Sequence, residues 1–525
     1  MGLIVQEAIS VEEMRRLDRN AALLGISPLQ LMESAGRSVA DEICSRINIE
    51  NKKVVIVAGL GNNGGDGFVV ARYLASRGAR VIVYLLGSEK DIRTDEARRN
   101  WLVLKGMRMN VVTREVHTAE DLEKLRSDLL DAEVIVDAIF GIGFRGLVSG
   151  VYARALQFMN ESKGLKVAID VPSGVNADTG DVGGIAFKAD LTVTFHRIKR
   201  GLIKAKEYVG ELIVKDIGIP EEAGYIVGLE DVARCFRPRR PFSKKGDHGR
   251  VLILGGSIEY TGAPTLSALA CLKMGIDIAI VASPKSVTNI IRGFDPCIIA
   301  RPLPDEEYLS PKSLKIAYEL AKRADVIVLG PGLGLRDETF EFVREFIKSV
   351  DRPMVVDADA LKALREHMKE ITGKELVLTP HAGEFRIMTG IELPSPENLC
   401  GRVKIVEEVA KKYDVTILLK GREDVISNGR RTRINMTGNA SMTAGGTGDV
   451  LTGVVASLIA MGNNPFDAAC AGAFINGLAG DLAVKRQGLI TARDLIECLQ
   501  EALKIVKDPR SLVELSHVAK VMIGD

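Results

Sequence analysis

Cysteine is scarce in this chain, with 7 among 525 residues, and no two of them form a C-x-x-C pair. This scarcity argues against a disulfide framework or a zinc site, and it fits a reducing cytoplasm. The chain also lacks an excess of charge of either sign, since its formal net charge is +1. Nothing in that balance favours nucleic acid or an anionic membrane as a partner.

Long apolar runs are missing as well. No run approaches the roughly eighteen residues that a membrane-spanning helix needs. The start, MGLIVQEAIS, has neither a basic region nor a long apolar segment, so we expect no signal peptide. What is present is the composition of an ordinary globular protein, 46% apolar and 26% charged, and the length predicts two or more domains.

Short, nearly all-apolar segments alternate with helical patterns along both halves of the chain. The strands predicted in the first half are KVVIVA, RVIVYLL, EVIVDAI, LKVAID, LTVTF and ELIVKD, and those in the second half are RVLILGG, DIAIVAS, DVIVLG, PMVVDA, ELVLT and DVTILLK. This alternation predicts an α/β fold with two doubly wound domains, each a parallel sheet covered on both faces. A basic, proline-bearing stretch, RCFRPRRPFSKKGDHGR, separates the halves and predicts domains 1–235 and 236–525.

The turn after the first predicted strand reads GLGNNGGDG, and its first six letters satisfy G-x-G-x-x-G. A dinucleotide site also needs an acidic residue at the end of the next strand, and the sequence has Leu85, Leu86 and Gly87 there. The turn itself instead contains two asparagines and an aspartate. Their side chains offer oxygens, which bind hydroxyl groups or a hard cation.

Two further strand ends in this half carry acids. Asp137 precedes a glycine-rich loop, and Asp170 and Ser173 flank Pro172. Ligands of open parallel sheets bind outside the carboxyl ends of the strands. We therefore expect Asn63, Asp137 and Ser173 to converge on one cation, and Asp66 and Asp170 to face a polar ligand.

The second half contains a glycine-rich helix entry, AGGTGDVLTG, which ends at residue 453. Backbone N–H groups at a helix N-terminus form an anion hole of the kind that a transferring phosphoryl group needs. An aspartate in the first turn is stabilised as an anion and can accept a proton from an attacking hydroxyl. The predicted roles are thus an anion hole at 446–448 and a base at Asp449. Ala263, at the entry to a helix, is a further candidate, and the candidates at strand ends are the glycines of LGPGLG (329–334), Asp357, Asp359, His381, Glu384 and Lys420.

Four motifs of the first half, LMESAG (31–36), GNNGGDG (61–67), VDAIFGIG (136–143) and DVPSG (170–174), resemble the YjeF N-terminal family of Rossmann-like NAD(P)H-hydrate epimerases, with Ser34 in place of the usual amide. The resemblance implies potassium ligands at Asn63, Asp137 and Ser173. It implies that the hydrated nucleotide is bound by Asn62, Asn63, Gly64, Gly65, Asp66, Gly141, Ile142, Gly143, Phe144, Arg145, Gly146, Leu147 and Asp170. Asp170 is the candidate acid/base, with Asp66 and Lys199 as alternatives.

The motifs of the second half resemble the YjeF C-terminal, ribokinase-like family of ADP/ATP-dependent NAD(P)H-hydrate dehydratases. The resemblance implies that Ala263, Gly332 or Gly334, His381 and Asp449 contact the substrate. It places the nucleotide on Lys420, Gly421, Arg422, Glu423, Asp424, Gly446, Thr447 and Gly448. The family commonly reads KG-x-x-T, whereas Gly421 is followed here by Arg422, Glu423 and Asp424.

The two resemblances together imply a bifunctional repair enzyme for hydrated NADH and NADPH (NADHX and NADPHX). The first domain would interconvert the R and S epimers. The second would phosphorylate the hydroxyl with ADP or ATP, assisted by magnesium, and eliminate phosphate. The family favours ADP and a homo-oligomer, and the preference between NADHX and NADPHX stays open. Two alternatives remain: a small-molecule kinase such as a thiazole or pyridoxal kinase, and a nucleotide-binding regulatory module in the first half.

Overall fold

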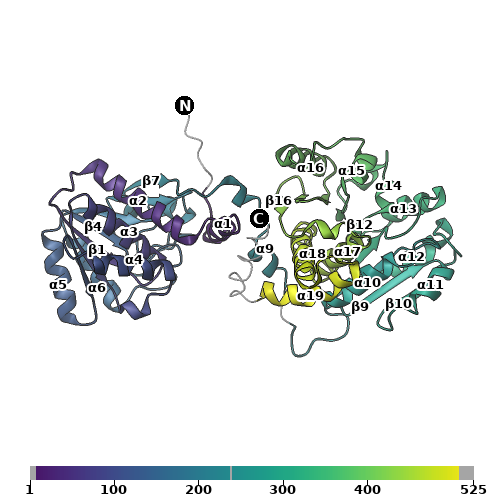
Figure 1. Cartoon of the computed structure of the whole chain (residues 1–525), viewed down its shortest axis with the longest axis horizontal. Coiled ribbons are helices and arrows are strands. Elements are labelled where there is room, and N and C mark those ends of the chain that lie inside the picture. The colour runs from purple at the N-terminus through teal and green to yellow at the C-terminus, as the bar shows by residue number, and fades with distance from the viewer. Residues whose placement is uncertain (1–7, 237–238, 508–525) are drawn as a thin grey trace. The chain divides into compact units, whose positions relative to one another are not determined.

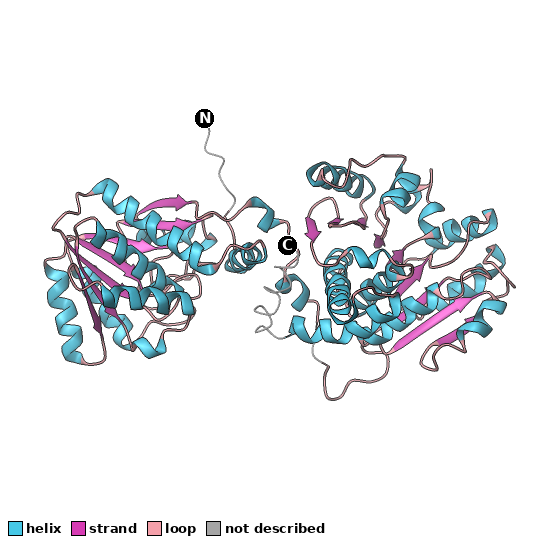
Figure 2. Cartoon of the chain, viewed as in Figure 1, coloured by secondary structure: helices cyan, strands magenta, loops and turns pink. Residues whose placement is uncertain are grey.

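The computed structural model describes residues 8–236 and 239–507, and its contacts divide the chain into two units after Ala223. Each unit contains one sheet with helices on both faces (Figures 1 and 2). Residues 224–235, which the sequence analysis assigned to the first domain, pack with the second unit. Cys235 Sγ lies 3.7 Å from the carbonyl oxygen of Asp467, and Val227 N donates to the carbonyl of Ile434.

The first unit has a seven-stranded parallel sheet in the order β3-β2-β1-β4-β5-β6-β7. This is the doubly wound order, with its switch point between β1 and β4. The strands are β1 (Lys53–Ala58), β2 (Arg80–Leu85), β3 (Val111–Glu115), β4 (Val134–Ala138), β5 (Leu165–Ile169), β6 (Leu191–Phe195) and β7 (Glu211–Lys215).

The helices of the first unit form two apolar layers on this sheet. One face packs against α1 (Val11–Leu23), α2 (Pro28–Arg46), α3 (Asn62–Ser76) and α4 (Asp95–Gly106), and the other against α5 (Ala119–Leu130) and α6 (Gly150–Glu161). The short helices α7 (Arg200–Lys204) and α8 (Lys206–Val209) precede β7. Capping boxes formed by Ser10 with Glu13 and by Ser27 with Gln30 fix where α1 and α2 begin.

The second unit has a nine-stranded sheet in the order β10-β9-β8-β11-β12-β13-β14-β15-β16, parallel except at β15 and β16. The strands are β8 (Arg250–Leu254), β9 (Ile278–Ser283), β10 (Ile299–Pro302), β11 (Val326–Leu329), β12 (Met354–Val356), β13 (Leu376–Leu378), β14 (Thr416–Leu419), β15 (Asp424–Ser427) and β16 (Thr432–Asn435).

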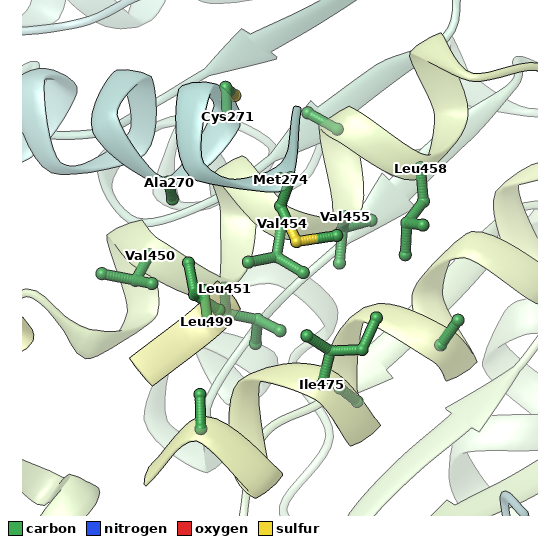
Figure 3. Close-up of a cluster of buried hydrophobic side chains, with 14 of the residues drawn as sticks. Ala270, Cys271, Met274, Val450, Leu451, Val454, Val455, Leu458, Ile475 and Leu499 are labelled. Carbon is green, nitrogen blue, oxygen red and sulfur yellow. The ribbon is translucent and has the colours of Figure 1, made fainter. Parts of the chain in front are cut away.

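The helices of the second unit also lie on two faces. One layer holds α9 (Leu229–Ala233), α10 (Ala263–Met274), α11 (Lys285–Ile291), α17 (Thr447–Ala460), α18 (Pro465–Gln487) and α19 (Ala492–Lys507). The other holds α12 (Leu314–Ala321), α13 (Asp337–Ser349), α14 (Asp359–Lys362), α15 (Ala382–Thr389) and α16 (Leu399–Tyr413). Figure 3 shows the first layer, where Met274 of α10 meets Val454 of α17. This packing fixes the N-terminus of α17 against the sheet.

Four strands, β3, β10, β15 and β16, were not predicted from the sequence. Three of them lie at sheet edges, where one side of the strand has no neighbour and the residues need not be apolar. β3 reads VVTRE and β16 reads TRIN, so neither gives the continuous apolar run that identified the central strands. No helix within the described ranges is long and apolar enough to cross a membrane.

Candidate active sites

The turn between β1 and α3 packs tightly against the loop that follows β4. A β-carbon added at Gly64 would overlap the carbonyl oxygen of Gly59, and one added at Gly59 would overlap the carbonyl oxygen of Ile139. Glycine is therefore required at both positions, and the backbone of the two loops forms one rigid corner. The corner opens α3 with Asn62 exposed and Asn63 buried.

Three of the predicted side chains meet beside this corner. Asp137 Oδ1 accepts the hydroxyl of Ser173 at 2.6 Å, and its Oδ2 accepts the Ser173 backbone N–H at 2.7 Å. Asn63 Oδ1 lies 3.4 Å from the position of a β-carbon at Gly141, on the loop that Phe140 N anchors by donating to Ser173 Oγ. The carboxyl ends of β4 and β5 thus bring Asp137 and Ser173 into direct contact, and Asn63, after β1, borders the adjoining loop at Gly141.

The oxygens of this cluster carry a charge that no described basic side chain balances. Burial raises the pKa of Asp137 to about 6, and only hydrogen bonds from Ser173 and Ile139 oppose the rise. The Asn63 Nδ2 atom is buried and has no hydrogen-bond partner among the residues described. A buried carboxylate beside amide and hydroxyl oxygens fits a hard monovalent cation. No group of three or more His, Cys, Asp or Glu side chains suited to a metal occurs in the described part of the chain.

Asp170 lies at the end of β5 in a strained backbone conformation, with φ of 64°. Its Oδ1 accepts hydrogen bonds from Lys199 Nζ at 2.5 Å and from Thr194 Oγ1 at 2.9 Å. Lys199 is 0% exposed and also donates to the carbonyl of Phe195. The second oxygen of Asp170 accepts no hydrogen bond from the described residues. The ion pair with Lys199 therefore engages one oxygen of Asp170 and leaves the other available to a ligand.

Two more carboxyls surround this ion pair. Burial, with the nearby charges of Asp170 and Asp18, raises the pKa of Asp66 well above its usual value, and Lys199 opposes the rise only in part. Burial also raises the pKa of Asp18 to about 7, with the Lys199 charge opposing and the Asp170 charge adding to the effect. The pKa values of both carboxyls are therefore raised, while Asp170 is paired with Lys199.

Asp18 was missed by the sequence analysis, although α1 carries a signal for it. The residue lies in the stripe of buried positions Val11, Met14 and Ala21, where an acidic side chain is out of place. Backbone hydrogen bonds join Ile9 to the carbonyl of Ile198 and Arg200 to the carbonyl of Ile9, and so dock α1 beside Lys199.

Only the start of the loop 141–147 lies at this candidate site. Gly141 lies beside Asn63, and Phe144 stacks on Phe140 with ring centroids 5.2 Å apart. The guanidinium of Arg145 is engaged by Asp178 at 2.8 Å. Leu147 is exposed, and Ile142 packs against the apolar residues of the first unit. The structure thus brings the start of the loop to the candidate site and leaves its end on the surface.

The candidate site of the second unit is centred on the N-terminus of α17. Gly446 precedes the helix with φ of 91°, and Asp449 lies in the first turn, where the helix dipole favours a negative charge. Burial and the charge of Asp357 raise the pKa of Asp449 to about 7, and Lys420 opposes the rise only in part. The predicted base therefore titrates near neutral pH.

Lys420 reaches the same helix end from β14. Its Nζ lies 2.8 Å from Asp357 Oδ1 and 3.4 Å from the position of a β-carbon at Gly448. Thr452, one turn after Asp449, donates to Asp357 Oδ2 at 2.9 Å. The sequence analysis did not select Thr452, whose signal is its spacing from Asp449 on one helix face. Thr447 donates instead to the backbone carbonyls of residues 442 and 444, which shapes the loop before the helix.

The predicted substrate residues lie along the neighbouring strand ends. A β-carbon at Gly332 would lie 3.2 Å from Ala263 Cβ, so these two residues are adjacent. Gly334 is buried and donates its N–H to Asp359 Oδ2, which favours Gly332 of the two glycines as a ligand contact. His381 Nδ1 accepts the N–H groups of Gly383 and Glu384, and its exposed Nε2 lies 3.5 Å from Glu384 Oε1.

The turn 421–424 is divided between structural and exposed positions. Asp424 Oδ1 accepts the N–H of Gly421 at 3.1 Å, and Oδ2 accepts the amide of Asn435 at 3.0 Å. Burial raises the pKa of Asp424 to about 6. The Arg422 side chain is 83% exposed and pairs with Glu423. Asp424 therefore closes the turn, while Gly421 and Arg422 are exposed.

Comparison with known families matches both units. Residues 251–501 match the family described as NAD(P)H-hydrate dehydratase, and residues 28–201 match the family described as YjeF-related protein N-terminus.

Comparison with individual proteins gives relatives over nearly the full chain. A protein of Pyrobaculum aerophilum named bifunctional NAD(P)H-hydrate repair enzyme is 46% identical over 503 residues, covering 95% of this chain and 98% of the relative. A protein of the same name from Hyperthermus butylicus is 42% identical, covering 95% and 92%. The solved ADP/ATP-dependent NAD(P)H-hydrate dehydratase of Bacillus subtilis is 26% identical with a TM-score of 0.47, covering 54% of this chain and 98% of that one.

Proposed function

Since the chain belongs to the family of bifunctional NAD(P)H-hydrate repair enzymes, we propose that its two units act in turn on hydrated NADH and NADPH. The second unit dehydrates the S epimer at the expense of ADP or ATP, and the first interconverts the R and S epimers. The observation that carries the proposal is the Asp449 carboxyl, held with a raised pKa at the glycine-bounded N-terminus of α17.

Dehydration starts with transfer of a phosphoryl group to the substrate hydroxyl. Asp449 accepts the hydroxyl proton while the oxygen attacks the terminal phosphorus, and the bond from phosphorus to the nucleotide's bridging oxygen breaks. The backbone N–H groups of 446–448 bind the moving phosphoryl, and Lys420 offers a positive charge beside Gly448. Magnesium, bound through the nucleotide phosphates, would neutralise the charge that develops there.

Elimination follows because phosphate leaves far more easily than hydroxide. The lone pair of the ring nitrogen forms a double bond to the carbon that bore the hydroxyl, and phosphate departs with the electrons of the C–O bond. Loss of a proton from the neighbouring ring carbon restores the dihydronicotinamide. ADP is our preferred donor for this unit.

The first unit has a base and an acid placed for epimerisation. The substrate hydroxyl lies on a carbon bonded to the ring nitrogen, so the ring opens when the C–N bond breaks. Asp170 accepts the hydroxyl proton, and Asp66, whose pKa is raised by burial, acts as the acid that supplies a proton to the nitrogen that leaves with the electron pair. Rotation of the resulting aldehyde and reversal of both transfers closes the ring on the other face. The nearby charge of Asp18 adds to the rise in the pKa of Asp66.

Potassium is proposed at Asn63, Asp137 and Ser173, whose oxygens and uncompensated carboxylate fit it. A cation there would hold the loop 141–147 against the turn after β1 and thereby shape the substrate site. It takes no part in proton transfer, because Asp170 and Lys199 form a separate ion pair.

Potassium is expected to raise both the stability and the epimerase rate of this chain. Because a ligand that binds only the folded state stabilises it, the melting temperature should rise with KCl but not with tetramethylammonium chloride. Asp137→Asn removes the negative charge and should weaken potassium binding at least about tenfold. Asp95→Asn, an exposed carboxylate on α4, is the control. Equal melting temperatures in both salts would contradict the site.

We also propose a homo-oligomer in the cytoplasm. The family resemblance supports the assembly, and the seven cysteines, all of them free, fit a reducing compartment. Size-exclusion chromatography with light scattering tests the oligomer directly.

Recovery of NADH absorbance from an epimer mixture of NADHX tests the function as a whole. With ADP or ATP, the wild-type chain is expected to recover all of the NADH, because the first unit keeps supplying the S epimer. If recovery stops at the amount of the S epimer, the second unit is a dehydratase and the first unit is not an epimerase. Absence of recovery with either nucleotide would exclude the dehydratase and point to a kinase with a stable phosphorylated product.

A further inference from the structure

Three loops of the second unit form a wall beside the candidate dehydratase site. They follow β8, β10 and β11 at the carboxyl ends of these strands, the same edge that carries Asp449, Lys420 and His381. Gly256 N donates to the carbonyl of Pro331 at 2.8 Å, and Ile258 N donates to the carbonyl of Glu307 at 3.0 Å. The wall is therefore continuous with the site and held by backbone hydrogen bonds.

Two tyrosines cover the glycines of this wall. Gly332 has φ of 67°, and a β-carbon there would lie 2.8 Å from Tyr260 Cβ. Gly334 has φ of 85°, and a β-carbon there would lie 3.2 Å from the Tyr308 ring. Tyr260 is 54% exposed although it is large and aromatic. The wall thus presents aromatic faces next to Ala263, where a planar ligand group can pack.

Arg336 lies on top of the second tyrosine. Its guanidinium carbon is 3.6 Å from the centroid of the Tyr308 ring, and the side chain is exposed. It makes no ion pair or side-chain hydrogen bond with any residue in the described ranges. Stacking on a tyrosine fixes the orientation of a guanidinium and leaves its fork of N–H donors available. Such a fork matches the geometry of a phosphate group.

The charges of the site separate along this edge of the sheet. Four carboxyls surround the reacting end, and Lys420 and Lys362 pair with two of them, Asp357 and Asp359; the other two are Asp449 and Glu384. The transferring phosphoryl group has the N–H groups of 446–448 to bind it, whereas the phosphates of the dinucleotide substrate need a positive group of their own, away from these carboxylates. Arg336, on the wall beyond Gly334, is a positive group placed for that purpose.

We propose that Arg336 binds a phosphate group of the hydrated dinucleotide, with the substrate lying along Tyr260 and Tyr308. The inference rests on the proposed dehydratase function of this unit. The phosphate is either the pyrophosphate, which both substrates carry, or the 2′-phosphate, which only NADPHX carries. In either case Arg336 sets the affinity for the substrate and takes no part in phosphoryl transfer.

Steady-state kinetics of Arg336→Ala with the S epimers of NADHX and NADPHX, at saturating ADP, test this assignment. KM is expected to rise about tenfold, the effect of losing one hydrogen-bonded charge, with kcat nearly unchanged. Arg336→Lys should recover part of the loss, because it keeps the charge but not the fork. Arg323→Ala, which removes an exposed arginine after α12, is the matched control and should leave KM unchanged.

The two substrates identify which phosphate is bound. A rise in KM for both assigns the pyrophosphate, and a rise for NADPHX alone assigns the 2′-phosphate. An unchanged KM for both substrates, or a rise in the KM of ADP alone, overturns the proposal. Calorimetric binding of NADPH does not require turnover. If the wild-type chain is inactive and Arg336→Ala still weakens NADPH binding, the proposed function fails while the phosphate site stands.

Discussion

Replacing Asp449 with asparagine is expected to lower kcat of NADHX dehydration about 10²- to 10⁴-fold, which is the rate enhancement that a positioned general base usually provides. The amide keeps the size of the side chain but cannot accept the hydroxyl proton. The wild-type rate should also fall as the pH drops through about 7, because burial and Asp357 raise the pKa of Asp449 to about 7 and protonation removes the base. A pH–rate profile measured on both proteins checks this prediction.

The melting temperature of Asp449→Asn shows whether the variant is folded. The pKa of Asp449 is higher in the folded state than its ordinary value of 3.8, so the folded state binds the proton more tightly and is destabilised as the pH rises through 7. Asp449→Asn escapes this loss and should melt at a higher temperature than the wild type at pH 8. Asp351→Asn, an exposed carboxylate of the same unit, should leave both the rate and the melting temperature unchanged. Dehydration by Asp449→Asn at the wild-type rate would remove Asp449 from the mechanism.

The second large effect is expected from Asp170→Asn in the first unit. Epimer exchange should slow about 10²- to 10⁴-fold, because the amide cannot accept the substrate proton. The second unit of the same chain provides the readout. With ADP and an epimer mixture, NADH recovery should rise quickly to the S share and then nearly stop, whereas the wild type should continue to completion.

Asp170→Asn also removes the ion-pair partner of Lys199, and this effect needs a separate control. Asp170→Asn leaves a buried ammonium beside a neutral side chain, which destabilises the unit. The double variant Asp170→Asn with Lys199→Met removes both charges and should restore stability without restoring exchange. Continued recovery beyond the S share at the wild-type rate, in either variant, would eliminate Asp170 as the base and leave Asp66 as the first alternative.

The sequence predicted those parts of the two sites that come from strand ends. Asn63, Asp137 and Ser173 lie at the ends of three strands that are neighbours in the sheet, so the parallel order alone places them at one edge. The GGTGD entry likewise predicted the position of Asp449, because glycines before an apolar helix admit few other structures.

Residues placed by tertiary packing could not be predicted in the same way. Asp18 reaches Lys199 only because α1 docks on the loop after β6, and this docking depends on backbone hydrogen bonds that leave no pattern in the sequence. Asp424 belongs to a predicted nucleotide loop, yet its second oxygen is taken by Asn435 from a strand that was not predicted. Arg336 is distinguished from other exposed arginines only by its stacking on Tyr308, which lies in a different loop.

The corner formed by Gly59 and Gly64 also limits how this protein can change over evolutionary time. Because any side chain at either position would collide with backbone, neither glycine can be exchanged one step at a time. Gly61, between them, meets no atom within 4 Å of an added β-carbon and is free to vary. Divergence toward another substrate must therefore proceed through side chains such as Asn62 and the loop 141–147. The path of the backbone around the ligand would be inherited unchanged.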